Sequence, residues 1–161
     1  MYLNIIFLPL CGSIFAGLGG RWLGSKGSCF ISTACLGLSA LFSLIAFYEV
    51  GLNQGKCIFT LMPWINADLF NVSWGFLFDT LSVSILVVVT FISFFVHLYS
   101  IEYIGNDPHL SRFISYLSLF TFFILILVSA DNFLQIFVGR EGVGLCSYLL
   151  INFWFTRILA N

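Results

Sequence analysis

Charged residues are scarce in this chain. Only 8% of its 161 residues are Asp, Glu, Lys or Arg, whereas an average soluble domain carries about 25%. The formal net charge is −1, and six residues are Lys or Arg. This composition excludes a water-soluble enzyme, a disordered tail and, for want of a basic patch, a nucleic-acid binder. Hydrophobic residues make up 60% of the chain and 20 of them are Phe, so the sequence predicts a multi-spanning membrane protein.

Targeting signals and paired cysteines are also missing. Residues 1–20 carry no charge, whereas a secretory signal begins with positive charge and a mitochondrial transit peptide contains several arginines. We therefore expect the first apolar segment to be a permanent span, in a bacterial or an organelle-encoded protein. The five cysteines are odd in number and lack a Cys-x-x-Cys spacing. We therefore expect no disulfide framework, no zinc site and no iron–sulfur cluster in this chain.

Five apolar runs approach the length that a membrane span requires. A bilayer core needs about 20 apolar residues of helix, and backbone groups that enter lipid must be paired within the helix. The sequence therefore predicts an all-α integral membrane protein with one membrane domain over residues 1–161. A Gly- and Ser-containing turn is expected at Arg21–Lys26. The expected transmembrane helices cover residues 2–22, 28–50, 80–104, 111–130 and 132–156.

The connection between the second and third helices has a character of its own. It is neither apolar enough to span a membrane nor polar enough to be an exposed loop, and it contains Pro63, Trp64 and Trp74. Tryptophan favours the headgroup layer. We expect an interfacial hairpin over residues 56–76 that turns near Asn66–Asp68.

Positive residues are distributed unevenly between the two sides. With the N-terminus outside, only Lys56 falls in an outer loop, and the inner loops contain Arg21, Lys26, Arg112 and Arg157. The positive-inside rule therefore predicts an outward N-terminus.

Glu141 is the strongest candidate for a functional residue. It lies ten residues beyond Asp131, which is about 15 Å along a helix and so near the middle of the bilayer. A carboxylate at that depth costs several kcal/mol unless it is protonated or paired. Such a group suits a proton relay, and the alternative is an acid that hydrogen-bonds to a neighbouring helix for packing alone. Gly139, Gly142 and Cys146 form a stripe of small residues that predicts close packing on another helix.

Other polar residues give weaker indications. Arg140 points about 100° away from Glu141 on a helix, so it requires another partner or a path to the interface. Asp79 is expected to cap the third helix. Asp131 either caps the fifth helix or opens a proton path to the outer face. His97 is expected near the inner end of its helix, where a structural role is more common than a catalytic one.

Four stretches carry a resemblance to a known family. They are WGFLFD (Trp74–Asp79), VVVTFISFFVHLYSIEYI ending at Ile104, ADNFL from Ala130, and EGVGLCSYLLI (Glu141–Ile151). The whole chain resembles the chain 5 family of respiratory complex I, NADH–ubiquinone oxidoreductase, in its mitochondrial form. The resemblance implies the N-terminal part of an antiporter-like core subunit of the membrane arm, which contributes part of a proton-translocation path coupled to quinone reduction.

The resemblance also implies residue roles and partners. Glu141 matches the family's essential glutamate, which pairs with a lysine two helices later, and the family places a hairpin on the outer face. This chain is expected to bind no cofactor, because FMN, iron–sulfur clusters and ubiquinone belong to other subunits. The expected partners are other membrane-arm subunits, including any chain that carries the remainder, and the lipid bilayer, but no nucleic acid. The expected location is the mitochondrial inner membrane, with the N-terminus towards the intermembrane space.

Two features depart from the family. Its members are several times longer, so the partner lysine lies beyond residue 161. The family also has Trp at the position of Arg140. A C-to-U change in the transcript converts an Arg codon to a Trp codon, so we expect Trp at this position in the protein. The alternatives are a subunit of a multi-subunit Na+/H+ antiporter, which shares fold and glutamate, and a structural fragment without transport activity.

Overall fold

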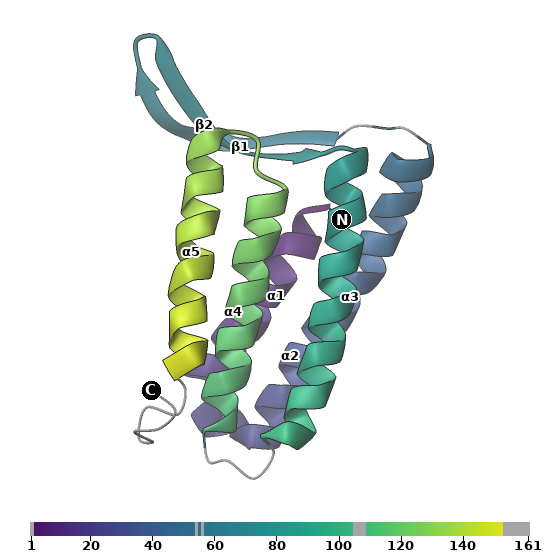
Figure 1. The fold of residues 1–161 in the computed structure, drawn as a ribbon, viewed down its shortest axis with the longest axis vertical. Coiled ribbons are helices and arrows are strands. Elements are labelled where there is room, and N and C mark those ends of the chain that lie inside the picture. The colour runs from purple at the N-terminus through teal and green to yellow at the C-terminus, as the bar shows by residue number, and fades with distance from the viewer. Residues whose placement is uncertain (1, 54, 56, 105–108, 153–161) are drawn as a thin grey trace.

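The computed structural model describes residues 2–53, 55, 57–104 and 109–152, which form five long helices and one β-hairpin (Figure 1). Four helical stretches are long and apolar enough to cross a membrane, and the first helix, at 17 residues, lies at the lower limit of about 17. This confirms the expected class of helical membrane protein. The elements are α1 (Tyr2–Leu18), α2 (Gly20–Ala46) with its π-helical extension η1 (Phe47–Leu52), β1 (Cys57–Ala67), β2 (Phe70–Phe78), α3 (Thr80–Tyr103), α4 (Leu110–Val128) and α5 (Phe133–Ile151).

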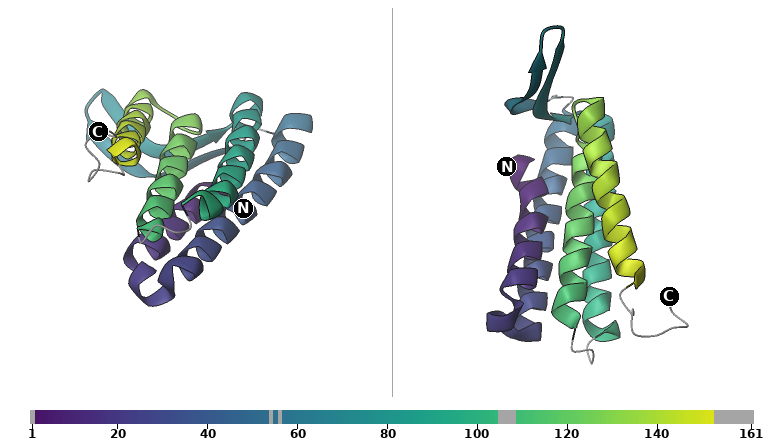
Figure 2. Two further views of the ribbon diagram at one scale, coloured as in Figure 1. Left: turned by 60° about the horizontal axis from the view of Figure 1, so that its bottom comes forward. Right: turned by 90° about the vertical axis from the view of Figure 1, so that its left-hand side faces the viewer.

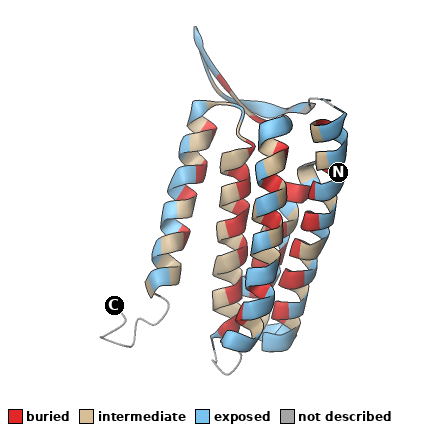
Figure 3. Cartoon of the chain, turned by 45° about the vertical axis from the view of Figure 1, so that its right-hand side comes forward, coloured by how far each residue is buried: buried red, intermediate tan, exposed pale blue. Residues whose placement is uncertain are grey.

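The helices run along one common axis, and the hairpin lies across one end of the bundle (Figures 1 and 2). We call this the hairpin end. The turn between α1 and α2 and the start of α4 lie at the opposite end. Helix α4 packs against α1, α2, α3 and α5, whereas α5 packs mainly on α4 and forms one edge of the bundle. Figure 3 shows the buried residues on the sides of the helices that face one another.

The turn between α1 and α2 differs from the sequence-based expectation. Helix α1 ends at Leu18 and α2 begins at Gly20, so most of the expected turn at Arg21–Lys26 is helical. A Cβ atom at Gly19 would lie 2.7 Å from the carbonyl oxygen of Phe15, so the chain turns where only glycine fits. Within the expected turn, Gly24 adopts a φ of +77° and kinks α2. Glycine adopts this conformation without steric cost.

A proline inside α1 depends on a serine from α2. Because Pro9 has no N–H group, the carbonyl oxygen of Ile5 loses its helical hydrogen bond. The hydroxyl of Ser39 donates to that oxygen at 2.7 Å, and Ser39 is fully buried. The hydroxyl of Ser32 likewise donates to the carbonyl oxygen of Gly12 at 3.2 Å. These side chains join the two helices. They also donate hydrogen bonds to backbone oxygens, which lipid cannot do.

Two apolar clusters stabilise the ends of the bundle. The larger lies beneath the hairpin and joins α1, η1, β2, α3 and α4; its members include Ile5, Val50, Phe78, Leu86 and Leu125. The smaller lies at the opposite end and contains Ala16, Cys29, Ile104, Leu110 and Ile114.

The hairpin is antiparallel and turns at Asp68 and Leu69. Cys57 pairs with Phe78, and Ala67 pairs with Phe70. The expected turn near Asn66–Asp68 is therefore displaced slightly along the chain, and Asp68 takes a φ of +47° in it. The rings of Trp64 and Trp74 stack with their centroids 4.8 Å apart. The prediction that an apolar, aromatic hairpin joins the second and third helices is therefore confirmed.

The cap of α3 is also as predicted. Asp79 has an extended backbone, and its carboxylate accepts a hydrogen bond from the backbone N–H of Ser82 at 2.8 Å. This bond satisfies one of the first N–H groups of α3.

Replacement of Ser39 by Ala tests its role opposite Pro9. We expect Ser39→Ala to lower the free energy of unfolding by about 1–2 kcal/mol, because a buried carbonyl loses its donor. In a Pro9→Ala background, where residue 9 regains an N–H group, the cost of Ser39→Ala should largely vanish. The measurement is the thermal midpoint of the four proteins of this double-mutant cycle.

Ser84→Ala is the matched control, because the Ser84 hydroxyl is exposed and donates to Thr80 in its own helix. An equal cost of Ser39→Ala in both backgrounds would contradict this account of α1.

Candidate functional site

Two side-chain amides fix the start of α5. The Asn132 side chain accepts a hydrogen bond from the backbone N–H of Gln135 at 2.9 Å and donates one to the carbonyl oxygen of Ser73 at 2.7 Å. The fully buried Gln135 accepts a hydrogen bond at Oε1 from the backbone N–H of Gly75, at 3.3 Å. The amides of Asn132 and Gln135 therefore attach the first turn of α5 to β2. The backbone adds a bond from Leu77 N–H to the Ser129 carbonyl at 3.0 Å.

The expectation that Asp131 caps α5 is wrong. Asn132 has the extended backbone of an N-cap residue, and Asp131 precedes it. An amide side chain can accept from the helix and donate to Ser73 at once, whereas an ionised carboxylate only accepts. This second bond explains why the cap is an asparagine.

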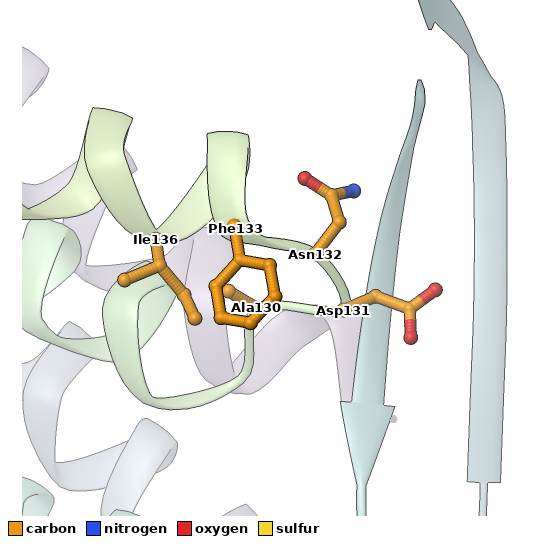
Figure 4. Close-up of a pocket in the computed structure, with 5 residues that line it drawn as sticks. All are labelled: Ala130, Asp131, Asn132, Phe133 and Ile136. Atoms are coloured by element: carbon orange, nitrogen blue, oxygen red, sulfur yellow. The ribbon is translucent and has the colours of Figure 1, made fainter. Parts of the chain in front are cut away.

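Asp131 lies exposed at the hairpin end beside a groove of about 350 Å³. Figure 4 shows its carboxyl group directed towards the hairpin strands and away from Phe133 and Ile136. The carboxyl group is open to the surroundings at this end. A role for Asp131 in a proton path stays a prediction.

Helix α5 approaches α4 through glycines, as the stripe of small residues predicts. A Cβ atom at Gly139 would lie 3.0 Å from the Cα atom of Leu127, and one at Gly142 would lie 2.3 Å from the ring of Phe123. Cys146, one turn further along, is fully buried. One face of α5 is therefore committed to α4.

Glu141 and Arg140 lie on the other side of α5. Both are exposed, and so are Phe137, Leu145 and Tyr148 on the same side. We call these five residues the exposed face of α5. Glu141 is eight residues beyond the first residue of α5, which is about 12 Å along the helix. In the part of the chain that the structure describes, neither Glu141 nor Arg140 forms a hydrogen bond or an ion pair.

His97 is buried in the bundle, towards the end of α3 that lies opposite the hairpin. Its ring is 1% exposed and lies between α3 and α4. The Nδ1 atom is 2.8 Å from the carbonyl oxygen of Ser93, and the Nε2 atom is 3.0 Å from the hydroxyl oxygen of Ser118. Because a carbonyl oxygen only accepts, Nδ1 carries the proton, and Nε2 of the neutral ring accepts from Ser118.

Further hydroxyl pairs continue this polar arrangement, which the sequence analysis missed. The hydroxyl of Thr121 donates to that of Ser93 at 3.2 Å, and those of Ser43 and Thr90 lie 2.9 Å apart. A groove of about 220 Å³ borders Ser93, His97 and Thr121. The signal in the sequence is the recurrence of Thr90, Ser93 and His97 on one side of α3. We call the paired residues of α2, α3 and α4 the hydroxyl ladder: Ser43, Thr90, Ser93, His97, Ser118 and Thr121.

The structure does not bring the sequence-predicted site residues together. His97 lies between α3 and α4, whereas Glu141 and Arg140 are on the side of α5 that points away from α4. Asp131 is ten residues before Glu141, about 15 Å away along the helix axis. Within the described residues, Glu141 and Arg140 therefore stand apart from His97 and Asp131.

These features define a multi-pass helical membrane protein with an exposed, charged helix face. Residues 64–114 match the family model for the N-terminus of chain 5 of NADH-ubiquinone oxidoreductase (complex I). All 161 residues align at 60% identity with NADH-ubiquinone oxidoreductase chain 5 of Chondrus crispus and of Arabidopsis thaliana, and at 52% with that of Mycosarcoma maydis. The chain belongs to this chain 5 family, and it spans 24% of the length of these relatives.

Two glycines in α5 give a matched test of the contact with α4. We expect Gly142→Ala to lower the free energy of unfolding by about 1–3 kcal/mol, because the new methyl group overlaps the Phe123 ring. Gly144 has no atom within 4 Å of an added Cβ, so Gly144→Ala should be neutral or stabilising by up to about 1 kcal/mol. The measurement is the thermal midpoint of the assembled protein.

The Phe123→Leu variant should reduce the cost of Gly142→Ala, because it removes the ring that the methyl group meets. Equal stability of the Gly142→Ala and Gly144→Ala proteins would contradict the close contact of α5 with α4.

Proposed function

We propose that this chain is the N-terminal part of a core membrane-arm subunit of the proton-pumping NADH:ubiquinone oxidoreductase, and that Glu141 transfers protons in it. The names of its relatives support the assignment to this enzyme, and one structural observation supports the role of Glu141. This observation is a carboxylate about 12 Å along a membrane-spanning helix, on the face that points away from the rest of the described chain.

The position of Glu141 requires a partner. An unpaired carboxylate inside a bilayer costs several kcal/mol, so it is either protonated or neutralised by a neighbouring positive charge. In the family that this chain resembles, the neighbour is a lysine two helices later, which lies beyond residue 161. Each charge in such a pair changes the proton affinity of the other. Approach of the lysine to Glu141 would then favour release of a proton from the carboxyl group, and movement of the lysine away would favour its protonation.

The remaining residues of α5 agree with this role. Helix α5 is held at its start by β2 and along its length by α4. The exposed face of α5 is therefore held in one orientation while a partner helix approaches it. A rigid support of this kind is what a proton-transfer pair needs, because transfer depends on distances of about 3 Å.

We also propose the surroundings of the chain. It lies in the mitochondrial inner membrane with its N-terminus towards the intermembrane space, beside the other membrane-arm subunits and the polypeptide that carries the remainder of chain 5. FMN, iron–sulfur clusters and ubiquinone are bound by other subunits. The positions of Arg21, Lys26 and Arg112, at the end opposite the hairpin, support this orientation.

Replacement of Glu141 by Gln tests the central residue. Gln keeps the shape of the side chain but cannot ionise, so we expect proton pumping by the assembled enzyme to fall by about 100-fold or more, as when a proton-transferring group is removed. Glu141→Asp should retain part of the activity. The measurement is the initial rate of proton uptake into vesicles that contain the purified enzyme, driven by NADH oxidation.

Glu102→Gln is the control, because Glu102 is an exposed acid at the far end of α3 and should be replaced without effect. Unchanged pumping by the Glu141→Gln enzyme would support a purely structural fragment instead. If the chain copurifies without a flavin-containing peripheral arm, the antiporter alternative replaces the oxidoreductase.

The identity of residue 140 is a separate prediction. An Arg side chain at this depth requires its own partner, whereas a Trp ring costs far less in lipid. We expect a peptide that spans residues 135–150 to show the mass of Trp at position 140 in the mature protein. A peptide mass spectrum with Arg at this position would contradict the proposed transcript change and would leave a permanent positive charge beside Glu141.

A further inference from the structure

A basic pocket lies at the end of the bundle opposite the hairpin. It has a volume of about 420 Å³ and is formed by the turn between α1 and α2 and by the start of α4. No Asp or Glu occurs among its described lining residues. Its polar lining consists of Arg21, His109, Ser111, Arg112, Ser115 and Tyr116.

Glycines bring the two sides of this pocket together. A Cβ atom at Gly17 would lie 2.7 Å from the Ser115 hydroxyl oxygen, and one at Gly20 would lie 3.1 Å from the Cβ atom of Ser111. The Ser115 hydroxyl donates to the carbonyl oxygen of Ser13 at 2.9 Å, which fixes α1 against α4. The α1–α2 turn therefore contacts the first turns of α4, and both contribute an arginine to one pocket.

The chemistry of the pocket suits a phosphate group. Arg21 and Arg112 supply two guanidinium groups, which bind phosphate oxygens by charge-assisted hydrogen bonds. Ser111 and Tyr116 add hydroxyl donors. Helix α4, 19 residues long, begins at Leu110, and the partial positive charge of its first turn favours an anion in addition.

An apolar strip leads away from the pocket along α1. Leu18 lines the pocket and is 84% exposed, and Ile14 and Cys11 are exposed on the same side of α1 at preceding turns. Trp22, which is 93% exposed, follows Arg21 and is a residue typical of the headgroup layer. A free phosphate ion would use only the pocket, whereas a phospholipid would use the pocket and the strip.

We propose that this pocket binds the phosphate-bearing headgroup of an anionic phospholipid, with acyl chains against Cys11, Ile14 and Leu18. Basic pockets between transmembrane helices on the positively charged side of a membrane bind such headgroups. The lipid joins the α1–α2 turn to the start of α4. This site is remote from Glu141 and does not depend on the proposed proton transfer.

The test uses the complete enzyme in mild detergent, freed of bound lipid, and a phosphatidylglycerol with a photoreactive acyl chain. The yield of cross-linked α1 peptide at increasing lipid concentration gives an apparent dissociation constant for this site alone. We expect Arg21→Gln to weaken binding about fivefold and Arg21→Gln with Arg112→Gln about 30-fold, since each basic residue near a membrane surface contributes about this factor. Lys26→Gln, which removes the same charge from a residue outside the pocket lining, should leave binding unchanged.

The controls distinguish the sources of phosphate. Unlabelled phosphatidylglycerol in large excess should abolish the cross-link, and inorganic phosphate at the same concentration should not. Equal competition by inorganic phosphate would overturn the lipid assignment, as would equal competition by phosphatidylcholine. Equal binding by the Arg21→Gln and Lys26→Gln enzymes would overturn the site. If the double variant does not assemble, Arg21→Glu reverses the charge of the exposed arginine alone and should weaken binding more than Arg21→Gln.

Discussion

The lack of hydrogen-bond partners in lipid is the constraint on which this structure depends. Every backbone oxygen that a helix leaves unpaired inside the bilayer must be satisfied by another protein group. Pro9 illustrates this, because it deprives Ile5 of a donor and the hydroxyl of Ser39 on α2 replaces it. The same constraint explains the hydroxyl ladder, in which serine and threonine side chains of three helices pair with one another and with His97.

The same lack of partners in lipid also bears on the charged residues of the exposed face of α5. The hairpin and α4 hold α5 in place through the amides of Asn132 and Gln135 and through two glycine contacts. This support directs Glu141 and Arg140 away from every described helix. An unpaired charge at such a depth is costly, and we therefore propose that a further protein segment covers this face. The relatives, of which this chain spans 24%, have sufficient additional length to supply it.

Much of the fold could be predicted because apolar runs and local caps are properties of neighbouring residues. The long helices, the aromatic hairpin, the Asp79 cap and the glycine stripe of α5 follow from patterns within a few positions. The end of α1 could not be predicted in this way. Glycine is required at position 19 because a Cβ atom there would lie too close to the carbonyl oxygen of Phe15. The choice of Asn132 over Asp131 depends on Ser73, which is 59 residues away in sequence.

The surroundings of the candidate residues were the least predictable part. Glu141 can be predicted as a candidate from its own segment alone, because a carboxylate within an apolar helix is rare. The burial of His97 depends on Ser118, 21 positions away, and the pairing of Ser43 with Thr90 joins residues 47 positions apart. Helix periodicity indicates which residues share a side of one helix, but it does not give the neighbouring helix or its level along the bundle.

The central claim is that protein, and not lipid, covers the exposed face of α5. A photoreactive amino acid at position 145, one turn beyond Glu141, tests this in the assembled enzyme. The account predicts cross-links from position 145 to a polypeptide segment that contains a lysine. Adducts with lipid alone would contradict it, because Glu141 would then face the bilayer without a partner for its charge.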